Sequence, residues 1–268
     1  MTRPAALVTG ASRGIGAAAA IALAEAGYDL AISARTLDDG ENGRKGSLSA
    51  TARHAEILGA QVVVSYMDLL DLETVDGAVD DALSAFGHVS TIVNNGVYKG
   101  PGDMDPLLGT PLDLLQRPIF ADLVAPTHIL QRLLPPMVDA GGGRVVNVTS
   151  MVAHMEPPGP LGRGGWGFGY GVAKGGFDRI AGLVNAELGD QGVTAHNVEP
   201  GFVAYGEKRT SAEAAYPGIE ITRPEAIGAV IAWLASHEDA NRFRNKLVHG
   251  PQLAADLGLD PEWSAPGS

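Results

Sequence analysis

The chain has 268 residues, 45% of them hydrophobic, which is enough for one sizeable core in one α/β domain. The net charge is −12 and no basic run occurs, so neither nucleic acid nor an anionic membrane is an expected partner. No cysteine is present, which excludes disulfides and thiolate metal sites, and no metal site is expected. The first apolar run, Ala5–Val8, is too short for a signal peptide or membrane span, so we expect a cytoplasmic protein.

The first half of the chain alternates short apolar runs with segments rich in helix formers. Helices are expected over Ala17–Ala26, from Ser47 or Ser49 to Leu58, and over Asp71–Phe86, with a polar loop at Thr36–Gly46. Strands are expected at Ala5–Thr9, Asp29–Ala34, Gln61–Met67 and Ser90–Asn94.

The second half continues the alternation with longer loops. Tyr98–Pro118 is expected to be irregular, and the next helix, Ile119–Val138, should kink at Pro126 and end near Pro135-Pro136. Further helices are predicted at Tyr170–Asp190 and Arg223–Ser236, and strands at Arg144–Thr149, Val193–Glu199 and Lys246–His249. Loops are expected at Met151–Gly169 and Phe202–Thr222, the latter with a short helix near Ser211–Ala215, and a mostly irregular tail from Pro251.

This alternation predicts an α/β fold, a doubly wound parallel sheet of about seven strands with helices on both faces. In such sheets ligands bind outside the carboxyl ends of the strands. The unusual residues of the chain stand there, after the predicted strands: Gly10, Arg35, Asp68, Asn94-Asn95, Ser150 and Pro200-Gly201. We therefore expect the functional site at this edge.

Two short patterns carry chemistry. Gly10–Gly16 joins the first strand to a helix, and its glycines allow a backbone to approach a phosphate at the helix N-terminus. Tyr170 and Lys174 stand four residues apart on a predicted helix, hence on one face. An ammonium group near a phenol favours the phenolate, which suits a general acid/base. Each pattern alone also fits a plain turn and a solvated helix pair.

Together these motifs resemble the short-chain dehydrogenase/reductase family. Thr9-Gly-Ala-Ser-Arg-Gly-Ile-Gly16, Asn94-Asn95-Gly96, Ser150, Tyr170-x-x-x-Lys174 and Pro200-Gly201 follow the order and approximate spacing of that family over nearly the whole chain. The resemblance implies one Rossmann-type domain over residues 1–250 with a tail at 251–268. It also implies a nicotinamide cofactor, a small-molecule substrate and a homodimer or homotetramer.

The family's residue roles carry over position by position. Tyr170 resembles the acid/base, Lys174 the residue that promotes tyrosine ionisation and holds the nicotinamide ribose, and Ser150 the hydroxyl that bonds the substrate oxygen. The remaining cofactor positions implied by the resemblance are Gly10, Ser12, Arg13, Gly14, Ile15, Gly16, Arg35, Asp68, Leu69, Asn95, Gly96, Pro200, Gly201 and Val203.

The residues after the second strand bear on cofactor choice. A carboxylate there would bind the adenosine ribose diol, whereas this chain has Arg35, with Arg13 in the glycine loop. Two guanidiniums would clamp a 2′-phosphate, so NADP(H) is expected over NAD(H). The alternatives are that both arginines are surface residues, or that Asp38 or Asp39 folds back to the ribose.

The chain departs from the family pattern in several places. Asp122 stands where the family has an asparagine that holds a relay water, and Tyr205 stands where many members carry threonine. Asp122 is either a catalytic residue near Lys174 or a solvated side chain in a shifted register. Met151–Gly169 is longer than usual, and is either a wall of a bulky apolar substrate pocket or a surface or oligomer-contact loop; its His154 is expected to be structural.

Three functions remain open on the sequence. The first is an oxidoreductase that interconverts a secondary alcohol and a ketone with Tyr170 as acid/base. The second is a cofactor-binding sensor or scaffold without turnover, which Asp122 and Tyr205 keep open. The third is a reductase of an enoyl carbon–carbon bond on the same fold.

Overall fold

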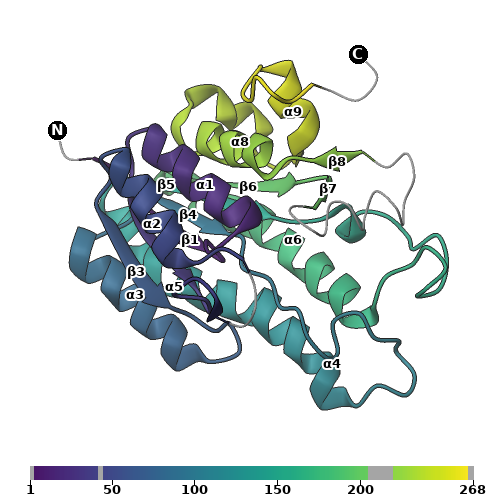
Figure 1. Ribbon diagram of the computed structural model, residues 1–268. Coiled ribbons are helices and arrows are strands. Elements are labelled where there is room, and N and C mark those ends of the chain that lie inside the picture. Colours follow the sequence, from purple (N-terminus) through teal and green to yellow (C-terminus); the bar gives the residue numbers. More distant parts are fainter. Residues whose placement is uncertain (1–2, 42–44, 205–219, 265–268) are drawn as a thin grey trace.

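The computed structural model describes residues 3–41, 45–204 and 220–264. Its centre is a seven-stranded sheet in the order β3-β2-β1-β4-β5-β6-β9, in which every pairing is parallel (Figure 1). The strands are β1 (Ala5–Thr9), β2 (Asp29–Ala34), β3 (Val62–Tyr66), β4 (Thr91–Asn94), β5 (Gly143–Val148), β6 (Val193–Glu199) and β9 (Leu247–His249). A separate pair joins β7 (Phe202–Val203) to β8 (Ile221–Thr222). The predicted doubly wound parallel sheet is confirmed.

Helices cover both faces of the sheet (Figure 1). On one face lie α1 (Gly14–Glu25), α2 (Leu48–Ile57) and α8 (Pro224–Ser236); on the other lie α3 (Leu72–Phe86), α5 (Ala125–Asp139) and α6 (Phe168–Leu188). Successive side chains of a strand point to opposite faces. In β1, Val8 therefore packs into the first layer and Leu7 into the second. Strands buried on both sides explain the continuous apolar runs of the sequence.

The order of the strands creates a crevice. Chain order runs outward in opposite directions from β1 and from β4, which are neighbours in the sheet. The connections after these two strands therefore leave toward opposite faces, and a gap opens at their carboxyl ends. Gly10 and Asn95 follow these two ends directly.

The helix caps agree with the sequence. The hydroxyl of Ser47 accepts a hydrogen bond from the Ala50 N–H at the start of α2, and the Asp71 carboxylate accepts one from the Glu73 N–H at the start of α3. Both side chains satisfy backbone donors that a first helical turn leaves unpaired.

The segment before β5 differs from the prediction. Helix α4 (Leu112–Ile119) begins inside the stretch expected to be irregular, because Leu115 and Pro118 form a buried stripe facing α6. A π-helical turn, η2 (Phe120–Val124), then leads into α5 without a break, and the Ala125 N–H donates to the Phe120 carbonyl five residues back. This π turn stands in place of a simple kink at Pro126.

Helix α5 ends close to its predicted end. It passes Pro135 and Pro136 and ends at Asp139, one residue after the predicted Val138. Ile129, Leu133 and Met137 are fully buried on the sheet side of the helix. Their burial holds the last turn in place although two backbone donors are missing.

The C-terminal segment contributes to the core. Helix α9 (Gly250–Asp256) opens the tail that was expected to be irregular, and its Leu253 and Ala254 are buried in the layer of α8. Farther on, the Trp263 indole N–H donates to the Pro251 carbonyl over 2.8 Å. The predicted short helix near Ser211–Ala215 lies outside the described residues. Within the described part of the chain, no helix combines the length and apolar character needed to cross a bilayer.

Candidate active site

The turn after β1 brings backbone against backbone. Gly10 and Gly14 have φ of +68° and +56°, a region that glycine adopts without strain. A Cβ on Gly16 would lie 2.3 Å from the Gly10 carbonyl oxygen, so a side chain has no room there. Helix α1 begins at Gly14, and its free N–H groups face the crevice as an anion site would require.

Asn95 and Thr9 tie the ends of β1 and β4 together. The Asn95 side-chain amide donates to the Thr9 and Gly10 carbonyls over 2.9 and 3.3 Å. In return, the Thr9 hydroxyl accepts from the backbone N–H groups of Asn95 and Gly96 over 3.0 and 2.9 Å. The asparagine motif therefore supports the glycine turn as well as facing the crevice.

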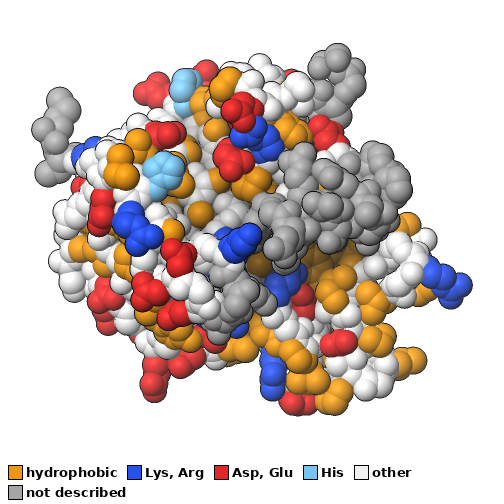
Figure 2. Space-filling model, in the orientation of Figure 1, with side chains coloured by type: hydrophobic (Ala, Val, Ile, Leu, Met, Phe, Trp, Pro, Cys, Tyr) orange, Lys and Arg blue, Asp and Glu red, His pale blue; other side chains and the backbone are white. Residues whose placement is uncertain are grey.

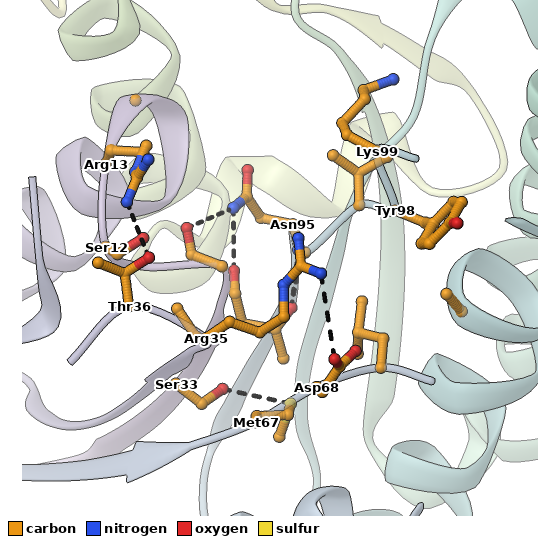
Figure 3. A pocket seen from close by; sticks show the side chains of 18 of the residues that line it. Ser12, Arg13, Ser33, Arg35, Thr36, Met67, Asp68, Asn95, Tyr98 and Lys99 are labelled. Atoms are coloured by element: carbon orange, nitrogen blue, oxygen red, sulfur yellow. Dashed lines mark hydrogen bonds and ion pairs between the residues drawn. The ribbon is translucent and has the colours of Figure 1, made fainter. Parts of the chain in front are cut away.

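A cleft of about 360 Å³ occupies the crevice (Figure 3). Most of the predicted cofactor residues line it: Gly10, Ser12, Arg13, Gly14, Ile15, Arg35, Asp68, Leu69, Asn95, Gly96 and Val203. The other predicted residues are not among its lining residues: Gly16, Asp122, Ser150, Tyr170, Lys174, Pro200 and Gly201. Lining residues that the sequence reasoning missed are Thr9, Ser33, Ala34, Thr36, Met67, Val97, Tyr98, Lys99 and Ala121. Several of these missed residues are next in sequence to predicted site residues at strand ends, and this adjacency could have identified them.

Two arginines stand in the wall of the cleft at the end of β2. The Arg13 guanidinium donates to the Thr36 hydroxyl and the Gly46 carbonyl over 2.9 and 3.0 Å. Arg35 extends into the cleft, with its Nη1 at 4.0 Å from Oδ2 of Asp68 (Figure 3). Among the described residues that line the cleft, Asp68 is the only one with a carboxylate, and it already lies near a cation.

The two acidic residues that could fold back to a ribose are held elsewhere. Asp38 Oδ1 accepts from the Ser49 hydroxyl over 2.5 Å, and Asp39 Oδ1 accepts from the Ser47 hydroxyl over 2.8 Å. Both serines belong to the start of α2, and neither aspartate lines the cleft. This arrangement counts against the alternative in which Asp38 or Asp39 binds the ribose.

Helix α6 carries the proposed catalytic pair. Tyr170 and Lys174 lie one turn apart, and Lys174 is only 5% exposed. The Lys174 ammonium donates to the Val148 carbonyl, the last residue of β5, over 3.1 Å. Ser150 follows two residues later, and its hydroxyl accepts from the Val152 N–H at the start of a short 3₁₀ turn. The end of β5 thus connects the serine and the lysine.

The chain is similar to known proteins in both sequence and fold. The family model for short chain dehydrogenases matches residues 4–215. A 3-oxoacyl-[acyl-carrier-protein] reductase from Synechocystis sp. is 30% identical over 88% of this chain and 90% of that protein. An L-rhamnose 1-dehydrogenase (NAD(P)(+)) from Sphingomonas sp. is also 30% identical, over 94% of each chain. The fold matches a 3-oxoacyl-[acyl-carrier protein] reductase from Brucella melitensis solved in complex with NAD, with a TM-score of 0.77, 24% identity and coverage of 93% and 96%.

The chain belongs to the short-chain dehydrogenase/reductase family. Membership supports an oxidoreductase that acts on CH–OH or C=O groups with a nicotinamide cofactor. The resemblance read from the motifs is confirmed at this level.

Asp122, which we expected at the position of the family's asparagine, is buried. Its side chain sits in the π turn, is 2% exposed, and accepts from the Tyr98 backbone N–H through Oδ1 over 2.6 Å. Within the described residues, Oδ2 has no hydrogen-bond partner. Burial raises the pKa of Asp122 to about 6, although attraction to Lys174 lowers it. The interpretation of Asp122 as a solvated surface residue is therefore wrong.

A buried amide chain crosses the sheet of the dehydrogenase and was not predicted. Asn94 donates to Asn147 over 3.0 Å, and Asn147 donates to Asn197 over 3.2 Å, at matched registers of β4, β5 and β6. Asn197 then donates to Oδ1 of Asp178, one turn after Lys174 on α6. The chain thus links the strand ends to the helix of the catalytic pair. The recurring asparagine near the end of each strand was the signal in the sequence.

The long loop before α6 contains His154, which contacts α6, and several exposed apolar side chains. His154 places Nε2 at 3.0 Å from Oδ1 of Asp178, which is in line with the structural part expected of it. Met155 and Phe168 expose 47% and 37% of their surface, and Trp166 packs over Gly171. Tyr205 lies outside the described residues. Among the described residues, no three His, Asp or Glu side chains gather as metal ligands would.

Proposed function

We propose that this protein is an NADP(H)-preferring dehydrogenase/reductase that interconverts a secondary alcohol and a ketone, with Tyr170 as the acid/base. The observation that carries the proposal is the buried Lys174, which lies one helical turn from Tyr170. Its ammonium donates to the carbonyl of Val148, two residues before Ser150 at the end of β5. A buried ammonium one helical turn from a phenol stabilises the phenolate form.

The residues around the cleft fit a dinucleotide. The glycine turn has no space for a Cβ at Gly16 and adopts positive φ at Gly10 and Gly14, as close approach of a pyrophosphate requires. The α1 N-terminus supplies free donors for the phosphates. Asp68 and Leu69 would hold the adenine, and Asn95 and Gly96 the adenosine side.

Hydride exchange with the substrate carbon is the chemistry that the nicotinamide supplies when bound. In ketone reduction, the Tyr170 hydroxyl gives its proton to the substrate oxygen, and in alcohol oxidation the phenolate takes that proton back. The Ser150 hydroxyl donates a hydrogen bond to the same oxygen and holds the carbon in line. Lys174 would bind the nicotinamide ribose and stand beside Tyr170 during proton exchange, while Pro200, Gly201 and Val203 would support the ring.

The preference for NADP(H) rests on charge. Arg13 and Arg35 both border the cleft beyond β2, and the nearby Asp38 and Asp39 are bonded to serines of α2. A 2′-phosphate would meet two guanidiniums, whereas the ribose diol of NAD would meet no free carboxylate there. Arg35→Ala is expected to weaken NADPH binding about tenfold with little effect on NADH, measured by fluorescence titration. Equal loss for both cofactors would contradict the preference.

The substrate side favours a bulky apolar compound. Exposed apolar side chains border the start of α6, with Met104 at 45%, Met155 at 47% and Phe168 at 37% exposure. Figure 2 shows hydrophobic surface gathered over the lobe formed by the beginning of α4 and the segment before it. Loops on a rigid sheet commonly form the variable wall of a pocket.

A turnover assay tests the function. Oxidation of NADPH is followed with a panel of ketones, which includes an acetoacetyl thioester, acetoin and aryl ketones, and with an enoyl thioester as the competing substrate class. Tyr170→Phe should lose at least about a hundredfold in kcat on the active ketone. Tight NADPH binding without turnover on any compound would instead favour the cofactor-binding sensor or scaffold. A homodimer or homotetramer stays a prediction, tested by light scattering on the purified protein.

A further inference from the structure

The segment after β4 caps the helix that carries Tyr170. The backbone N–H groups of Phe168 and Tyr170, in the first turn of α6, donate to the carbonyls of Asp105 and Asp103 over 3.0 and 3.1 Å. The first N–H groups of a helix have no partner inside it, so these carbonyls replace a side-chain cap. A Cβ on Gly167 would lie 2.2 Å from the Asp103 carbonyl oxygen, which shows how closely the segment is seated.

An ion pair in this segment lies over the tyrosine. The Lys99 Nζ is 3.1 Å from Oδ2 of Asp103 and 4.3 Å from the centroid of the Tyr170 ring. The Asp103 side chain is 4% exposed, while that of Lys99 is 50% exposed. The buried Asp103 carboxylate therefore anchors the Lys99 ammonium, and the Asp103 backbone carbonyl accepts a hydrogen bond from the Tyr170 N–H.

The position of this ammonium has an electrostatic consequence. A cation near a ring face is attracted by the ring quadrupole, and more strongly by a ring that carries a full negative charge. Lys99 therefore attracts the Tyr170 ring and helps to hold it in place. Among the described residues, Asp103 also interacts electrostatically with Lys174 and Asp105, and Asp122 in the π turn interacts with Lys174, Asp103 and Lys99.

We propose that Lys99, anchored by Asp103, is a positioning residue for Tyr170 that fixes the ring beside the cleft and adds a second cation to stabilise its phenolate. The inference rests on the acid/base role proposed above for Tyr170. Lys99 lines the cleft, and in Figure 3 its side chain extends away from the Arg35–Asp68 end of it. It therefore acts at the substrate end of the site.

The direct test measures Tyr170 ionisation without any substrate. Ultraviolet absorbance of tyrosinate is titrated with pH for each protein, and the curve of the matching Tyr170→Phe protein is subtracted. In Lys99→Met the ionisation should move about one pH unit upward, and in Lys99→Arg it should stay close to that of the unchanged protein.

Two variants serve as controls. Lys99→Gln removes the cation while keeping a hydrogen-bond donor for the Asp103 carboxylate, and it should show the same upward shift if Lys99→Met folds poorly. Arg242→Met removes an exposed cation from the rings of Trp233 and Phe243 and should leave Tyr170 unchanged. An unaltered Tyr170 titration in folded Lys99→Met, or in folded Lys99→Gln, overturns the inference.

Kinetics separates this inference from the proposed function. With the ketone that the panel identifies, Lys99→Met should lower kcat about tenfold at neutral pH and move the pH–rate profile by about one unit. A change confined to KM for an anionic ketone, with no shift of the profile, would make Lys99 a substrate-binding residue and reject the inference. If no ketone turns over, the proposed function fails, while the tyrosinate titration still decides the inference.

Discussion

Replacement of Asp122 by asparagine should stabilise the protein in a pH-dependent way. Burial raises the pKa of Asp122 from 3.8 to about 6, so the folded state disfavours the charged carboxylate. A shift of about two units corresponds to about 3 kcal/mol at 1.36 kcal/mol per unit. The side chain is 2% exposed, so solvent screening does not reduce this figure appreciably.

The sign of the effect follows from proton binding. Between pH 3.8 and about 6 the folded state holds the proton on Asp122 more tightly than the unfolded state does, so stability falls as pH rises through this window. The destabilisation is complete above pH 6 and absent below 3.8. Asparagine does not titrate, and its Oδ1 can still accept from the Tyr98 N–H.

Urea denaturation at fixed protein concentration measures the difference. The gain in unfolding free energy of Asp122→Asn over the unchanged protein should be about 1.4 kcal/mol larger at pH 7.5 than at pH 5. A constant packing cost of the amide cancels in this comparison. Asp113→Asn, an exposed carboxylate on α4, is the matched control and should show no such trend. A gain that is the same at both pH values would refute the reasoning.

The same variant probes catalysis. In the unchanged protein, ionisation of Asp122 near pH 6 places a negative charge close to Lys174. The pH–rate profile should therefore contain an inflection near pH 6 that Asp122→Asn lacks. Identical profiles would exclude a relay or tuning role for Asp122.

Three further substitutions test other parts of the structure. Burial lowers the pKa of His196 to about 4, so a stabilisation of about 3 kcal/mol is complete above pH 6.5 and lost as pH falls toward 4; His196→Gln should flatten this part of the stability curve in urea titrations. Asn147→Ala removes the hydrogen-bond partner of both the Asn94 and the Asn197 side chains and should lower the unfolding free energy by about 2–4 kcal/mol. A loss below about 1 kcal/mol would show that the buried amide chain of Asn94, Asn147 and Asn197 does not stabilise the fold. Gly16→Ala should abolish NADPH binding in calorimetry with the fold retained in circular dichroism, because its Cβ would meet the Gly10 carbonyl at 2.3 Å, and retained affinity would show that the turn can relax.

Much of the fold could be predicted from local patterns. Strands buried on both faces appear as short apolar runs, and glycine, serine and aspartate mark the ends of helices. Ser47 and Asp71 are caps as expected. An error falls where tertiary packing outweighs local preference: α4 forms in a stretch expected to be irregular, and its Leu115 and Pro118 are buried.

By itself the sequence determined the family, the alternation of strands and helices along the chain and the residue types at the strand ends, because these depend on short motifs and on periodicity. Only the tertiary structure decided which charges meet. Lys99 lies over Tyr170, and Asp122 lies near Lys174, through contacts between segments far apart in the chain. Electrostatic interaction depends on distance and burial, and neither is encoded in a local pattern.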